Sequence, residues 1–104
     1  MNQIDLRSFL TDSAALPKST TLVRENGLRT LLLHLKDGEG LPEHHTKGAI
    51  TVECLKGKVT FLAGEEKVEL APGLLISLAP GKPHSLTAGE DSLLLVTISE
   101  QIVE

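Results

Sequence analysis

Short hydrophobic runs alternate with polar turns along most of the chain, and no convincing 3.6-residue hydrophobic stripe follows residue 16. This pattern is typical of the strands of a β-sandwich or barrel. After Pro17 it predicts strands at 20–25, 29–36, 49–55, 58–63, 66–71, 74–78, 84–88 and 93–99. Glycine, proline, asparagine and aspartate mark the separators, and these residues favour tight turns.

The beginning of the chain allows two interpretations. Residues 8–16 can form one helical turn that ends at Pro17, whereas residues 4–9 can equally form an edge strand. We therefore expect an N-terminal strand or helical turn within residues 1–28, ahead of a barrel core at about 29–98.

Two kinds of hydrophobic pattern distinguish the predicted strands. Val59, Phe61, Val68 and Leu70 alternate with polar residues, which predicts strands buried on one face and joined at Gly64-Glu65 as a hairpin. The runs 74–76 and 93–96 lack that alternation, which predicts strands covered on both faces. A second sheet or a second subunit can supply the cover, so we expect a homodimer, which light scattering would test.

Composition limits the class of protein. A chain of 104 residues is long enough for one domain, and its two aromatic residues, Phe9 and Phe61, leave the core aliphatic. The net charge of −4 and the scarcity of clustered basic residues argue against a nucleic-acid partner. No hydrophobic run approaches a membrane span, and a single cysteine without a basic apolar leader leads us to expect a cytoplasmic protein.

Two stretches, 40–45 and 73–84, each run from a glycine-marked turn to a histidine. In an antiparallel barrel, turns placed in this way can bring His44 and His84 into one mouth, where small ligands and metals bind.

This order of turns and histidines resembles the cupins in their small single-domain bacterial form. In the first cupin motif, Gly40, His44 and Gly57 match by spacing, while Thr46 and Ile50 stand where the family has a second histidine and a glutamate. In the second motif the matching residues are Gly73, Gly81 and His84, with Ala79 at the proline position and Ala88 at the asparagine position. The resemblance implies an all-β fold, an antiparallel double-stranded β-helix or jelly-roll barrel.

In the cupin family, three histidines and a glutamate hold a divalent transition ion. Of these four ligands only His44 and His84 map directly, and Ile50 supplies neither a lone pair nor charge. His45 can complete a three-histidine site for iron, manganese, nickel or zinc if the backbone bulges there, because adjacent strand residues otherwise face opposite ways. The alternatives are that His44 and His84 cap the mouth as neutral, hydrogen-bonded residues, or that they bind an anionic or carbonyl-bearing ligand.

Other polar residues have interpretations of lesser weight. His34, between leucines, is more typical of a satisfied core histidine than of a ligand, and Cys54 of a small buried hydrophobe. Glu43 can orient a histidine or act as a base, but is more typical of a solvated loop charge. Thr46 and Ser85 place hydroxyls near the inferred mouth.

Two functions follow from these observations. The first is a non-catalytic or sensory small-molecule-binding barrel, with a pocket formed by His44, Ile50, Val52, Phe61, Ile76, His84 and Leu86. The second is a metal-dependent dioxygenase or isomerase of a small organic substrate that uses His44, His45 and His84. The departures at Thr46 and Ile50 favour the first.

Overall fold

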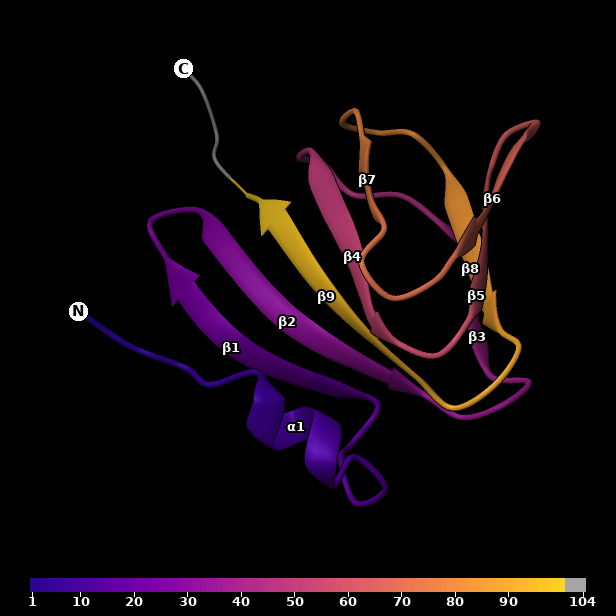
Figure 1. Cartoon of the computed structure of the whole chain (residues 1–104). Coiled ribbons are helices and arrows are strands. Elements are labelled where there is room, and N and C mark those ends of the chain that lie inside the picture. The colour runs from indigo at the N-terminus through magenta and orange to yellow at the C-terminus, as the bar shows by residue number, and fades with distance from the viewer. Residues whose placement is uncertain (101–104) are drawn as a thin grey trace.

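The computed structural model describes residues 1–100, and these form one short helix followed by nine strands (Figure 1). The elements are α1 (Arg7–Thr11), β1 (Ser19–Glu25), β2 (Leu28–Leu35), β3 (Gly40–His44), β4 (Ile50–Lys56), β5 (Val59–Ala63), β6 (Glu66–Leu70), β7 (Leu75–Leu78), β8 (His84–Ala88) and β9 (Ser92–Ser99). Of the two interpretations of the N-terminal region, the helical one is correct in kind, but the helix ends at Thr11 and not at Pro17. No helix within residues 1–100 has both the length and the apolar character needed to cross a bilayer.

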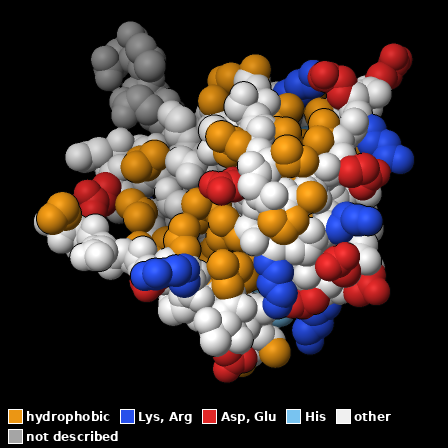
Figure 2. All heavy atoms as spheres, viewed as in Figure 1, with side chains coloured by type: hydrophobic (Ala, Val, Ile, Leu, Met, Phe, Trp, Pro, Cys, Tyr) orange, Lys and Arg blue, Asp and Glu red, His pale blue; other side chains and the backbone are white. Residues whose placement is uncertain are grey.

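The strands form two antiparallel sheets that face each other. One sheet has the order β1-β2-β9-β4-β7 and the other the order β3-β8-β5-β6. The buried core lies between them and is almost wholly aliphatic; Phe61 is its one aromatic residue in the described part of the chain. The predicted all-β jelly-roll architecture is confirmed. Figure 2 shows hydrophobic side chains in the middle of this face, between the sheets, with many charged side chains toward the β6 side.

Strand β3 was not among the predicted strands. Its sequence contains Gly40 and Pro42, and both residues weaken the strand signal. The structure tolerates Pro42, which has no backbone N–H, because β3 is an edge strand with a neighbouring strand on one side only. Its pairing with β8 shifts register between Leu41 and His44, so the bulge expected near Pro42 is present.

Exposure on the edge strands corrects two details of the predicted pattern. Val68 on β6 is 38% exposed although it shares the inward face with buried Leu70. Leu74 and Leu75 are 47% and 61% exposed, so within this chain the run 74–76 is not covered on both faces as predicted. In each case the reason is that the strand, β6 or β7, lies at the edge of its sheet and has a neighbouring strand on one side only. Buried Leu93 and Leu94 do have the predicted double cover.

The segment before β1 packs against the outer side of the larger sheet (Figure 1). The backbone amide of His34 donates to the Lys18 carbonyl at 2.8 Å, and the Lys56 ammonium donates to the Ser13 hydroxyl at 2.9 Å. Ser13 is buried as a result. These bonds, together with the contact of the His34 ring with the Leu16 carbonyl, hold this segment against β2 and β4.

Candidate functional site

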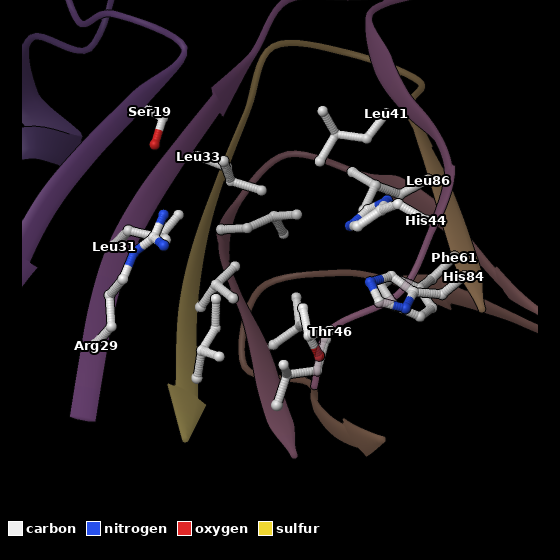
Figure 3. Close-up of a pocket in the computed structure, with 15 residues that line it drawn as sticks. Ser19, Arg29, Leu31, Leu33, Leu41, His44, Thr46, Phe61, His84 and Leu86 are labelled. Carbon is white, nitrogen blue, oxygen red and sulfur yellow. The ribbon is translucent and has the colours of Figure 1, made fainter. Parts of the chain in front are cut away.

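A cavity of about 260 Å³ lies between the two sheets (Figure 3). Its apolar walls come mainly from β2, β4 and β9, and its polar groups are few. The lining residues are Ser19, Arg29, Leu31, Leu33, Leu41, His44, Thr46, Ile50, Val52, Phe61, His84, Leu86, Leu94, Val96 and Ile98. A concave, mostly apolar space with a few convergent polar groups is the usual form of a small-ligand site.

His44 and His84 meet at one wall of this cavity. They are direct register partners in the pairing of β3 with β8, although forty residues separate them along the chain. Their ring centroids are 4.3 Å apart and the ring planes meet at 61°. The two turns therefore bring both imidazoles into one pocket, as the positions of the glycines and prolines predict.

Backbone carbonyls fix the orientation of both rings. Nδ1 of His44 lies 2.9 Å from the Pro42 carbonyl oxygen, and Nδ1 of His84 lies 3.0 Å from that of Lys82. Because a carbonyl oxygen only accepts, each ring donates from Nδ1, and in the neutral ring Nε2 then carries a lone pair. His84 also stacks on Phe61, with centroids 5.5 Å apart and planes 11° from parallel. Both histidines are thus held in place before any ligand arrives.

All but one of the predicted pocket residues line this cavity; the exception is Ile76. Ile76 lies on β7, where it pairs with Val52, and it lines a separate hollow with Val68 and Leu78. Since β7 is the edge of its sheet farthest from β2, its inward side chain faces β6 and not the histidines.

The three predicted metal ligands do not come together. His45 is exposed, follows the last residue of β3 and is absent from the cavity lining. The bulge lies before His44, so His44 and His45 keep the opposite directions of neighbouring extended residues. Within residues 1–100 no three histidine, cysteine, aspartate or glutamate side chains form a group that could hold a metal ion.

Of the remaining candidate residues, one lines the cavity and the others do not. Thr46 lines the cavity, and its hydroxyl donates to the Gly48 carbonyl at 2.8 Å. Ser85 and Glu43 do not line it. His34 is buried beneath the N-terminal segment, as expected of a satisfied core histidine.

Cys54 is fully buried in the core and lies outside the cavity lining, as the sequence predicts. Burial raises the pKa of its thiol above the ordinary value, so the protonated form is favoured. This environment is that of a packed hydrophobe and not of a nucleophile.

Arg29 and Ser19 line the cavity but were not singled out from the sequence. Arg29, like Leu31 and Leu33, lies on the inward face of β2, because alternate residues of a strand face the same way. The period-two rule puts Arg29 on the same face as Leu31 and Leu33, but the unbroken leucine run 31–33 does not show which face of the strand is inward.

Comparison with known proteins identifies the fold and leaves the activity open. No family model and no curated protein matches the chain. A conserved protein of unknown function from Streptococcus pyogenes is similar in structure, with 27% identity, a TM-score of 0.75, and 82% of this chain and 75% of that chain covered.

Two further solved structures are similar. A cupin superfamily protein from Desulfitobacterium hafniense has 20% identity and a TM-score of 0.75, with 78% of this chain and 74% of that chain covered. KdgF from Halomonas sp. has 19% identity and a TM-score of 0.73, with 81% and 78% covered. At these identities the likeness concerns the fold alone.

Proposed function

The chain is a small protein with the cupin fold, and we propose that it binds a small, largely aliphatic molecule in the cavity between its sheets, without catalysing a reaction on it. His44 and His84 contact the polar part of that molecule through Nε2. The aliphatic wall supplies most of the affinity by burying apolar surface.

One observation carries this proposal: two imidazoles, each fixed through Nδ1 so that Nε2 is left for a ligand, line a mostly apolar pocket. Fixed polar groups lose little conformational freedom when a ligand arrives, so their hydrogen bonds contribute fully to affinity and orientation. The volume of about 260 Å³ lies just below the range of drug-sized pockets, which favours a compact ligand.

The donor set does not suit a resident metal of the cupin kind. Two neutral imidazoles would leave an ion half coordinated, and Ile50 occupies the position at which the family supplies a carboxylate. These residues therefore support binding ahead of metal-dependent catalysis.

Ligand binding can be tested by recording ¹H–¹⁵N spectra of the protein with a library of small aliphatic alcohols, amides and acids. We expect shifts at cavity residues such as Leu86 and Val96. Leu41→Trp fills the cavity from the half-buried edge strand and should abolish these shifts. Leu62→Trp is the matched control, because Leu62 is 41% exposed on β5 and does not line the cavity.

The proposal fails if no member of the library perturbs the cavity at millimolar concentration, or if Leu41→Trp binds as well as the unaltered protein. If Leu41→Trp does not fold, Ile98→Phe is used in its place. Ile98 is half-buried on β9 and lines the cavity, so a larger side chain there narrows it.

A metal-dependent enzyme is the second candidate, and one observation favours it. Histidines that ligate metals usually donate their second ring nitrogen to a carbonyl or carboxylate, and His44 and His84 both do so. Two such nitrogens are too few for the site that the family implies, so this candidate ranks below binding.

A further inference from the structure

We propose that Arg29 is the anion-binding group of the cavity and that the ligand is a small carboxylate with a short aliphatic body. This inference rests on the proposed binding function and names the chemical class of the ligand.

The first argument is the position of the guanidinium. Arg29 projects from the inward face of β2 beside Leu31, on the wall across from the histidines (Figure 3). Its side chain is 29% exposed, and its Nε is buried without a hydrogen-bond partner among residues 1–100. Buried donors in proteins are almost always satisfied, so an unpartnered one beside a cavity indicates a missing acceptor.

The second argument is that one edge of the guanidinium has no hydrogen-bond partner among residues 1–100. Nη1 donates to the Glu100 carboxylate at 3.4 Å, a long contact, and no hydrogen bond from Nε or Nη2 to a described residue is formed. Nε and Nη2 together form the fork that binds both oxygens of a carboxylate. In this same chain, Nε and Nη2 of Arg7 hold the two oxygens of Asp5 at 3.0 and 3.1 Å.

The third argument is the balance of charge. Arg24 is the cross-strand partner of Arg29 on β1, which adds a second positive charge on the neighbouring strand. Glu100 is the carboxylate that contacts Arg29, and it is 42% exposed. One partly solvated carboxylate does not saturate the Arg29 guanidinium, so a ligand carboxylate can bind without displacing it.

Between Arg29 and the histidines the cavity wall is aliphatic, from Leu33, Leu94 and Val96 among others. A ligand that spans this wall needs an apolar body, a carboxylate at the Arg29 end and room for a polar group at the Nε2 end. Short carboxylic acids of four to eight carbons, with or without a hydroxyl group, have this chemistry.

The test compares hexanoate with hexan-1-ol by calorimetry and ¹H–¹⁵N spectroscopy. We expect hexanoate to bind at least tenfold more tightly than hexan-1-ol to the unaltered protein. Arg29→Met should remove this preference and leave the binding of hexan-1-ol within about twofold. Arg7→Met removes the same charge from an exposed site and should change neither ligand. Arg29→Lys keeps the charge without the fork and should retain only part of the preference.

The outcomes separate the two proposals. If the alcohol binds as tightly as the acid, or if Arg29→Met keeps the preference, the assignment of Arg29 is overturned while the binding function stands. If neither hexanoate nor hexan-1-ol binds in the cavity, the binding function is itself overturned and this assignment falls with it.

Discussion

The imidazole Nε2 of His34 lies 2.8 Å from Oδ1 of Asp91, so a buried histidine on β2 is tied to the turn before β9. The other ring nitrogen, Nδ1, lies 3.2 Å from the Leu16 carbonyl. Both partners are acceptors, and only the doubly protonated ring donates to both. Oδ2 of Asp91 meets Lys56 Nζ at 3.2 Å, and Lys56 also holds Ser13. One carboxylate thus organises the two contacts that hold residues 13–16 against the sheet.

Asp91→Asn should loosen this N-terminal segment. The amide keeps the shape but loses the charge that His34 and Lys56 share, and we expect a stability loss of about 1 kcal/mol, since Asp91 is partly exposed. Hydrogen exchange should accelerate at the amides of Leu16 and His34, which bond within or to this segment. Asp37→Asn, at an exposed turn, is the control; equal exchange in both variants would contradict the role of Asp91.

Acid should weaken the same contact. The hydrogen bond from His34 is the main cause that lowers the pKa of Asp91 below its ordinary value. A carboxyl group whose pKa is lowered by folding stabilises the protein above its unfolded pKa of about 3.9, and this contribution is lost as pH falls through the folded value. Denaturant melts from pH 6 to pH 2.5 should therefore show the unaltered protein and Asp91→Asn converging in stability below about pH 4. A difference in stability between the two proteins that stays constant over that pH range would contradict this role of Asp91.

The sheets were largely predictable because their signals are local. The turn at Gly64-Glu65 joins Ala63 to Glu66 as the sequence predicts, and the buried alternation of Val59 and Phe61 sets the inward face. What the pattern could not provide is which strands stand at the edges. Leu75 lies in a run that predicts cover on both faces, yet within this chain it is exposed, because sheet order depends on contacts distant in the sequence.

Gly57 should be far less replaceable than Gly73. Both have positive φ, 91° and 94°, so an alanine at either position is strained by about 1–2 kcal/mol. A Cβ at Gly57 would also collide with the Ser92 hydroxyl and the Asp91 carbonyl, whereas nothing lies within 4 Å of one at Gly73. We expect Gly57→Ala to cost about 3 kcal/mol or more and Gly73→Ala about 1–2. Equal losses in thermal or denaturant melts would show that the collision is relieved by backbone movement.

The thiol of Cys54 should react only through opening of the structure. It is fully buried, its Sγ lies 3.4 Å from the Lys56 carbonyl oxygen, and burial raises its pKa, so thiolate is scarce at neutral pH. We expect a disulfide reagent to modify the native protein on the order of a thousandfold more slowly than the urea-unfolded chain. Cys54→Ser with an introduced exposed cysteine, Ser99→Cys, supplies the fast native reference. A native Cys54 that reacts as fast as this reference would contradict its burial.

The candidate site was predictable as far as the backbone turns decide it. His44 and His84 follow glycine and proline turns, so their meeting could be inferred from spacing. The direction of His45 and Ile76 could not, because it depends on where the bulge in β3 falls and on β7 being an edge. Arg29 was missed for a different reason: the leucine run 31–33 has no alternation that would show which face of its strand is inward.

Metal content distinguishes the two candidate functions. Protein purified without an affinity tag should contain much less than one equivalent of iron, manganese, nickel or zinc, because His44 and His84 are the only cavity-lining ligands of this kind among residues 1–100. Added Zn²⁺ should bind weakly, and His44→Ala with His84→Ala should abolish that binding. His45→Ala is the informative control, since His45 is exposed and away from the pair, and should leave Zn²⁺ affinity unchanged. About one tightly held equivalent, lost in either His44→Ala or His45→Ala, would favour the metal-dependent enzyme, because it would mean that β3 rearranges to bring a third imidazole into the cavity.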